Sequence, residues 1–138
     1  MKKFNLWLVT LLLLFCGANE IIAQTKPWVA PASSNGTENP FKGDVKATIS
    51  GQKIFNQMCY ICHGLQGKGD GSGGMSINPR PANFLSAAIK SETDGNLFWK
   101  MTVGRGPMIS YAEIYSEKQR WQLVDYIRQL QKKIETKS

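Results

Sequence analysis

Two cysteines separated by two residues, followed at once by the only histidine of the chain, constrain this sequence more than any other feature. They are Cys59, Cys62 and His63, in the stretch "MCYICHG". Cysteine pairs at this spacing occur in structural zinc sites, redox-active dithiols, small disulfide loops and sites of covalent cofactor attachment. The remainder of the sequence separates these four alternatives.

Three of the alternatives do not fit. A structural zinc site takes four ligands, but two cysteines and one histidine remain once Cys16, in a segment predicted to be removed, is set aside. A thioredoxin-like dithiol starts a helix after a strand, whereas Cys59 and Cys62 end a predicted helix. A disulfide between them would close a very small loop, stabilise the fold little and leave His63 without a role.

Covalent haem attachment uses all three residues. Two thiols add across the vinyl groups of a haem, and the following histidine places an imidazole under the iron as the proximal ligand. The haem also supplies apolar mass that a small chain with few helices and long loops lacks. The sequence therefore predicts one covalently attached haem c, bound through Cys59, Cys62 and His63.

The amino-terminal segment has the layout of a secretory signal peptide. Lys2 and Lys3 precede an apolar run over residues 6–15, which is too short to span a bilayer. Cleavage near Ala23 gives a signal peptide over residues 1–23 and predicts an exported, periplasmic protein.

Two further features concern the region that follows the apolar run. Cys16 follows leucines as the lipid-modified cysteine of a bacterial lipoprotein does, although Phe15 is larger than the residue that such a cleavage site prefers. Residues 24–40 are rich in Pro, Ser, Asn and Thr, which predicts a flexible leader. Residues 41–134 are predicted to form a single domain.

The charge of the chain limits its partners. Seventeen lysines and arginines against ten acidic residues give a formal net charge of +7, but the basic residues are scattered. The absence of a basic run argues against nucleic-acid binding. A basic exported protein is suited to acidic protein partners or to peripheral contact with a membrane surface.

Apolar spacing predicts an all-α domain. One helix is expected from about Lys46 into the cysteine motif, a second over residues 93–104 and a third over residues 117–134. Ser116 and Gln119 form a capping box before the third helix. A long loop is expected between Gly64 and Phe84, and no run of residues predicts a strand.

The sixth position of a haem iron separates electron transfer from chemistry on small ligands. Because the chain has no second histidine, its methionines are the candidates. Met58 adjoins the attachment site on the wrong side of the ring, Met75 lies in a glycine-rich loop, and Met101 lies on an apolar helix face. Met108, in "GRGPMISY", follows a loop that can bring its thioether over the distal face. Met108 is therefore the predicted partner of His63 on the iron.

Four stretches in order, "GQKIFNQMCYICHGLQGKGDG", "NPRPANF", "TDGNLFWKMTVGRGPM" and "RWQLVDYIRQL", resemble a single-haem class I cytochrome c of bacterial respiratory chains. The similarity runs from about Pro40 to Leu130. It implies the cytochrome c fold, with a few short helices and long loops wrapped around one haem. It also implies that the first and last helices cross, with Gly51 and Phe55 against Leu123 and Tyr126.

The resemblance further implies a loop proline whose carbonyl accepts a hydrogen bond from the proximal histidine, and Pro79 or Pro81 could serve. Ile109 follows Met108 where many relatives have a proline. Arg80, Trp99 and Arg105 are candidates to reach the haem propionates. Lys68, Lys90 and Lys100 are expected to ring the exposed haem edge and to steer acidic partners.

The expected function is that of a single-electron carrier with His/Met ligation, and not of an enzyme. The expected partners are redox proteins, such as membrane reductase and oxidase complexes. Two alternatives remain open. One is a haem c subunit of a larger oxidoreductase. The other is an open-site haem protein with peroxidase or gas-binding activity, which requires a free sixth position.

Overall fold

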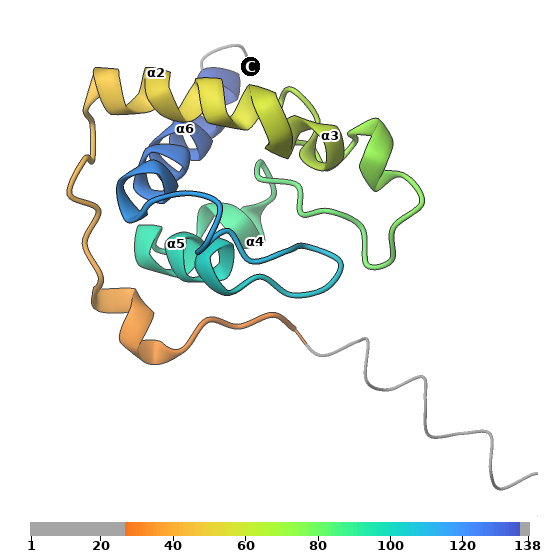
Figure 1. The fold of residues 1–138 in the computed structure, drawn as a ribbon, viewed down its shortest axis with the longest axis horizontal. Helices are drawn as coiled ribbons and strands as arrows, with labels where there is room; N and C mark the ends of the chain where they lie inside the picture. Colours follow the sequence, from red (N-terminus) through yellow and green to blue (C-terminus); the bar gives the residue numbers. More distant parts are fainter. Residues whose placement is uncertain (1–26, 136–138) are drawn as a thin grey trace, which may run out of the picture.

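The computed structural model describes residues 27–135, so the predicted signal peptide and Cys16 lie outside the described residues. Within this range no strand is present, and one isolated bridge joins Arg105 to Met108. The predicted all-α class is confirmed (Figure 1). In chain order the elements are the 3-10 helix η2 (Ala32–Gly36), α2 (Val45–Ile54), the π-helical turn η3 (Phe55–Cys59), α3 (Tyr60–His63), the 3-10 turn η4 (Ser72–Gly74), α4 (Ala87–Lys90), α5 (Asp94–Val103) and α6 (Glu117–Glu135).

The first predicted helix is observed as the uninterrupted succession of α2, η3 and α3, which runs into the cysteine motif. Asp44 caps it, because its Oδ1 accepts hydrogen bonds from the backbone N–H groups of Lys46 (2.7 Å) and Ala47 (3.1 Å). The π-helical turn ends at Cys59, where the N–H of Tyr60 bonds to the carbonyl of Phe55. The motif therefore begins at a change of helical geometry, a feature that recurs at functional sites.

The two other predicted helices are also present, each with a side-chain cap at its start. Thr93 Oγ1 accepts from the N–H of Asn96 (3.1 Å) at the start of α5. Before α6, Ser116 and Gln119 form the reciprocal capping box, with contacts of 2.9 and 3.3 Å. None of the helices within residues 27–135 combines the length and apolar character needed to cross a membrane.

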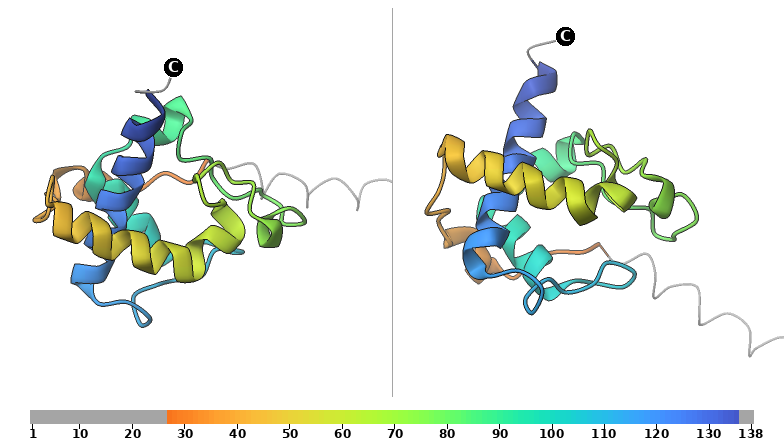
Figure 2. Two further views of the ribbon diagram at one scale, coloured as in Figure 1. Left: turned by 90° about the horizontal axis from the view of Figure 1, so that it is seen from above. Right: turned by 45° about the horizontal axis from the view of Figure 1, so that its top comes forward.

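The fold is organised by the crossing of α2 and α6, which Figure 2 shows from two directions. A Cβ atom on Gly51 would lie 1.9 Å from the Gln122 carbonyl oxygen and 3.1 Å from the Leu123 nitrogen. Only glycine lets the two backbones approach this closely. The crossing implied by the family resemblance is thus observed at the expected glycine.

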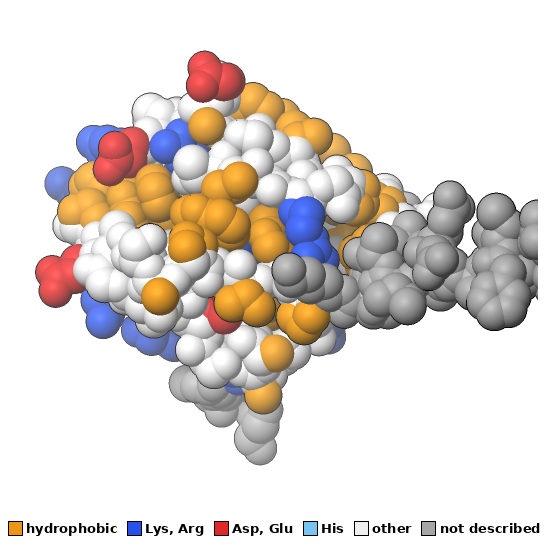
Figure 3. Space-filling view, turned by 90° about the horizontal axis from the view of Figure 1, so that it is seen from below, with side chains coloured by type: hydrophobic (Ala, Val, Ile, Leu, Met, Phe, Trp, Pro, Cys, Tyr) orange, Lys and Arg blue, Asp and Glu red, His pale blue; other side chains and the backbone are white. Residues whose placement is uncertain are grey.

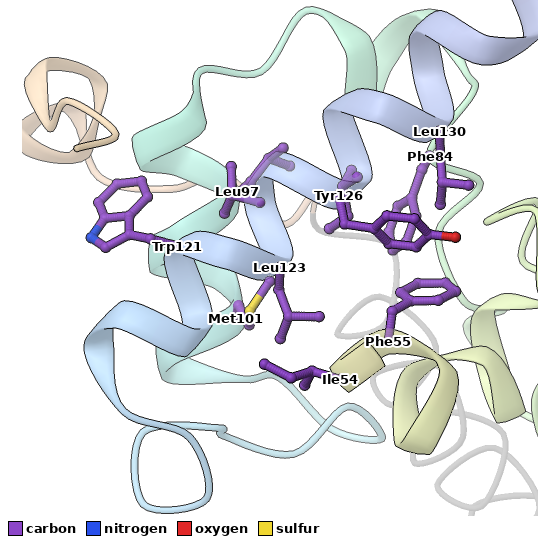
Figure 4. Packing of buried hydrophobic residues seen from close by; sticks show 11 residues of the cluster. Ile54, Phe55, Phe84, Leu97, Met101, Trp121, Leu123, Tyr126 and Leu130 are labelled. Atoms are coloured by element: carbon purple, nitrogen blue, oxygen red, sulfur yellow. The ribbon is translucent and has the colours of Figure 1, made fainter. Parts of the chain in front are cut away.

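The hydrophobic core lies beneath this crossing and is drawn in Figure 4. Phe55 contributes an aromatic ring 5.2 Å from that of Tyr126, and Phe98 stacks on Trp121 at 4.0 Å. The buried cluster draws on α2, η3, α5, α6 and the loop before α4; its members are Ile54, Phe55, Phe84, Leu97, Met101, Trp121, Leu123, Val124, Tyr126, Ile127 and Leu130.

The prediction of a flexible leader is wrong for its described part, residues 27–40. This segment contains η2 and packs along α5. Ser34 is buried and its hydroxyl contacts Asn96 Oδ1 at 2.5 Å, while Asn39 is buried against α6. Polar side chains, and not apolar ones, make these contacts, so the segment lacked the periodicity by which a packed element is recognised in a sequence.

Candidate haem site

The two cysteines lie three residues apart at the end of the first helix, which places them on one side of it. Both are free thiols and half-buried, and Cys59 packs against the core. Burial raises the pKa of the Cys59 thiol to about 12, with a smaller contribution from the neighbouring Cys62. The Cys59 thiol is therefore protonated at neutral pH, and both thiols are partly accessible at the end of one helix.

The glycine-rich loop after the motif presses against the last carbonyls of this helix. The N–H of Gly69 bonds to the His63 carbonyl (2.8 Å), and that of Gly71 bonds to the Cys62 carbonyl (3.2 Å). A Cβ on Gly71 would lie 2.3 Å from the Ile61 carbonyl oxygen, so the loop can approach only with glycine at this position. The loop thereby satisfies the helix end and fixes the motif.

The His63 ring is held from two sides. Its Nδ1 lies 3.1 Å from the Ala82 carbonyl oxygen, and because a carbonyl only accepts, Nδ1 carries the proton. The Phe84 ring stacks on the imidazole with centroids 4.5 Å apart. Burial lowers the pKa of His63, and the bond to Ala82 opposes this in part. The neutral imidazole consequently keeps Nε2 free to bind a metal.

The carbonyl beside His63 differs from the expected one. The sequence offered Pro79 or Pro81, but the acceptor belongs to Ala82, the residue after Pro81. Neither Ala82 nor Phe84 was predicted to contact His63. Both lie in "NPRPANF", but a backbone acceptor has no side-chain signature, and a phenylalanine in a loop carries no periodic signal.

The four methionines within residues 27–135 have different surroundings. Met101 is buried in the core. The sulfur of Met58 faces the Tyr115 hydroxyl at 3.9 Å, and that of Met75 faces an Arg80 nitrogen at 3.2 Å. Met108 is half-buried, and no described side chain engages its sulfur. Of the four, Met108 is thus the thioether left available to a ligand-binding role.

Met108 closes a tight turn that is tied to the end of α5. Its N–H and carbonyl both bond to Arg105, at 3.0 and 2.9 Å. Three residues later, the N–H of Tyr111 bonds to the Met101 carbonyl at 3.1 Å. Burial raises the pKa of Tyr111 to about 12, with smaller contributions from nearby Cys59, Tyr115 and Cys62. The segment that follows Met108 therefore lies close to the attachment cysteines.

The predicted peripheral residues are placed differently from one another. Lys68 is exposed, as partner steering requires. Lys100 forms an ion pair with Glu92 and its side chain is only 12% exposed, so it is not a free charge on the surface. Arg80 points to Met75, and Arg105 lies over the ring of Trp28.

A cavity of about 840 Å³ opens on the other side of the molecule, between residues 37–49 and α5 and α6. Its lining includes Asp94, Asp125 and Arg128, but none of the residues of the cysteine motif and not Met108. It is therefore separate from the candidate haem site.

The residues at the site fit a haem c. Two thiols on one side of a helix match two vinyl groups, and the adjacent imidazole has the tautomer that leaves Nε2 for iron. Apolar side chains that are partly exposed around the motif, those of Met58, Tyr60, Ile61 and Leu65, offer the apolar surroundings that a porphyrin ring prefers.

Comparisons with known proteins agree with this chemistry. A sequence model of the cytochrome c family matches residues 49–131, which is more than half of the chain. No curated protein sequence matches. Among solved structures, the chain is similar to a chain of the reducing HAO-like protein complex Kustc0457/Kustc0458 of Kuenenia stuttgartiensis, at 25% identity and a TM-score of 0.60.

That similarity covers 68% of this chain and 49% of the other chain, so this protein spans about half the length of its structural relative. The family match includes the whole cysteine motif and reaches into α6. Together with the helical fold, it shows that the chain belongs to the cytochrome c family, whose covalently attached haem c serves electron transfer.

Proposed function

We propose that this protein is a single-electron carrier of an exported, periplasmic electron-transfer chain. One haem c would be attached through Cys59 and Cys62, with His63 as the proximal ligand and Met108 as the sixth ligand. The observation that carries the proposal is the state of the His63 ring, whose Nδ1–H is committed to Ala82 and whose Nε2 is left for iron.

The protein residues tune such a site in two ways. The Ala82 carbonyl fixes the tautomer and raises the basicity of the imidazole, while the stacked Phe84 ring restricts its rotation. The Met108 thioether is a neutral, soft ligand that raises the potential. A haem c held by Cys59, Cys62, His63 and Met108 would supply one-electron chemistry at its iron.

The structural relative supports a second candidate, a haem subunit of a larger oxidoreductase. That relative comes from the complex Kustc0457/Kustc0458, and this chain spans only 49% of its length. Under this alternative the same residues bind the haem, but the electron passes to a fixed neighbour. Stable co-purification with a larger redox complex would distinguish the subunit from the free carrier.

The ligand assignment is tested by the optical spectrum of the oxidised, exported holoprotein. Methionine on ferric haem gives a weak charge-transfer band at the red end of the visible spectrum. We expect this band in the parent protein and its complete loss in Met108→Ala. Met75→Ala is the matched control, because Met75 is a half-exposed methionine in the other loop of the site, with its sulfur on Arg80.

The two other outcomes have separate meanings. Loss of the band in Met75→Ala with retention in Met108→Ala would move the sixth ligand to the glycine-rich loop. A parent protein with attached haem, no such band and a high-spin ferric spectrum would contradict the carrier and would favour an open-site protein that binds peroxide or a gas.

A further inference from the structure

The amino-terminal segment over residues 27–40 is here called the strap. Its carboxyl-terminal half is held on the domain by hydrogen bonds. The Ser34 hydroxyl contacts Asn96 Oδ1 at 2.5 Å. The Asn39 amide donates to Asp125 Oδ1 (3.0 Å) and Asp94 Oδ2 (3.3 Å). The strap lies at the lower side of the molecule in Figure 1, and Figure 3 shows the molecule from below, with hydrophobic side chains across the middle and lysines and arginines at several places around them. Such anchors make the strap a rigid extension of α5 and α6.

At the amino-terminal end of the strap, the Trp28 ring contacts two cationic side chains. The Lys100 ammonium lies 5.6 Å from the centroid of the Trp28 ring, and the Arg105 guanidinium carbon lies 5.4 Å from it. Both distances are within the range of a cation–π interaction. Lys100 belongs to α5 and is paired with Glu92, so it is fixed, whereas Arg105 belongs to the loop after α5. Trp28 thus joins a fixed helix to that loop.

Arg105 is also bonded to Met108 through the backbone. The two residues exchange both backbone hydrogen bonds, with Arg105 N–H to the Met108 carbonyl at 2.9 Å and Met108 N–H to the Arg105 carbonyl at 3.0 Å. A displacement of Arg105 therefore displaces the backbone that carries the thioether. On the other side of Met108, the Ser110 hydroxyl bonds to the Thr102 carbonyl at 2.6 Å and ties the loop to α5 again.

The residue after Met108 leaves the loop backbone less restricted, so outside contacts matter for its position. Ile109 is 53% exposed, and an isoleucine restricts the backbone less than a proline would. Pro107 restricts the backbone before Met108, but after Met108 the position of the loop depends on contacts with the rest of the molecule. The strap supplies such a contact on the side of Met108 that the Ser110 tie does not cover.

We infer that Trp28 is a positioning residue for the sixth ligand. By holding Arg105, it keeps the Met108 turn in the conformation in which the thioether can bind the iron. This inference rests on the proposed role of Met108. Removal of the Trp28 ring is expected to let the turn open more often, so that an external ligand competes with Met108 more effectively.

The test is the affinity of the oxidised holoprotein for imidazole, measured by optical titration. Trp28→Ala is expected to bind imidazole about tenfold more tightly than the parent protein, because the loss of two cation–π contacts weakens the closed state. Trp28→Phe keeps a ring at this position and is expected to restore most of the parent affinity. Val29→Ala is the matched control, since Val29 is the next residue of the strap and its side chain is 75% exposed.

Thermal unfolding of the same four proteins separates positioning from general stability. If Trp28→Ala lowers the unfolding midpoint but leaves the imidazole affinity within twofold of the parent, Trp28 only stabilises the strap and the inference is wrong. Equal tightening in Trp28→Ala and Val29→Ala would also overturn it, because the effect would then not depend on the ring.

Met108→Ala sets the upper limit of the titration. If the parent protein already binds imidazole as tightly as Met108→Ala does, the proposed sixth ligand is wrong. If only the parent protein and Trp28→Ala agree with each other, the ligand assignment stands and the role of Trp28 fails.

Discussion

Asp125 is a carboxylate that the fold buries with only part of its hydrogen-bonding capacity used. The residue is 6% exposed; its Oδ1 accepts from Asn39, and its Oδ2 has no partner among the described residues. Burial raises the pKa of Asp125 from 3.8 to about 6; the nearby Asp94 and Asp44 add to this, and the Asn39 amide opposes it. At neutral pH the charge of this group is therefore a cost to folding.

The sign of the resulting pH dependence follows from linkage. The folded protein holds a proton on Asp125 between about pH 4 and 6 that the unfolded chain has released, so the free energy of unfolding falls as pH rises through this range. We expect this contribution to be roughly 1–3 kcal/mol. It should be absent from Asp125→Asn, in which nothing titrates at this position.

Chemical denaturation of the holoprotein at pH 4, 5, 6 and 7 measures the effect as the difference between the parent protein and Asp125→Asn. Carboxyl groups that do not interact with Asp125 titrate alike in both proteins and cancel. A difference that does not change across these pH values would show that Asp125 ionises as freely in the folded protein as in the unfolded chain.

At the scale of residues, the sequence predicted the residues that bind the cofactor better than the contacts that hold those residues in place. Cys59, Cys62 and His63 form a contiguous motif whose spacing is specific, and the fold holds them at the end of one helix. Met108 stays a prediction, which its half-buried and unengaged sulfur favours. The contacts of Ala82 and Trp28 arise only in three dimensions, because each joins segments that lie far apart in the chain.

The crossing of α2 and α6 is the element on which the fold depends most visibly. Gly51→Ala would place a methyl group 1.9 Å from the Gln122 carbonyl oxygen, and a backbone atom cannot move aside as a flexible side chain can. We expect the free energy of unfolding to fall by about 3 kcal/mol or more. Denaturant unfolding of the holoprotein measures it.

Gly36→Ala is the matched control, because a Cβ on Gly36 meets nothing within 4 Å. Its substitution is expected to change the free energy of unfolding by less than about 0.5 kcal/mol. Equal effects at the two positions would mean that alanine destabilises through the backbone alone and that the close crossing is not required.

At the scale of elements, the helices with regularly spaced apolar residues were predicted, and segments without such spacing were not. The helices that end at His63, at Val103 and at Glu135 were predicted because each carries apolar residues at helical spacing, and Ser116 with Gln119 also marks the start of the last one. The short α4 and the strap were not. Four residues are too few to establish a period, and the strap is bound by polar groups and by one tryptophan, which in a Pro- and Ser-rich stretch looks like a linker.

At the scale of the whole molecule, the described residues form a helical domain of a family that carries a covalently attached haem c. Apolar side chains around the cysteine motif are partly exposed, and a long loop with one 3-10 turn joins the motif to α4. Sequence reasoning reached the family and the fold class because the motif implied a haem before any packing was known. The sequence does not identify the partner, because electron transfer between proteins requires no substrate pocket lined by recognisable side chains.

The central claim is that His63 and Met108 are the two ligands from the chain that the haem iron would take, which leaves no open position for a small molecule. Its most direct test is titration of the reduced holoprotein with carbon monoxide at neutral pH. We predict no binding by the parent protein at concentrations that saturate Met108→Ala, because the thioether occupies the position that the gas requires. Ready binding by the parent protein would contradict a closed site and would make small-ligand chemistry the better account of this cytochrome.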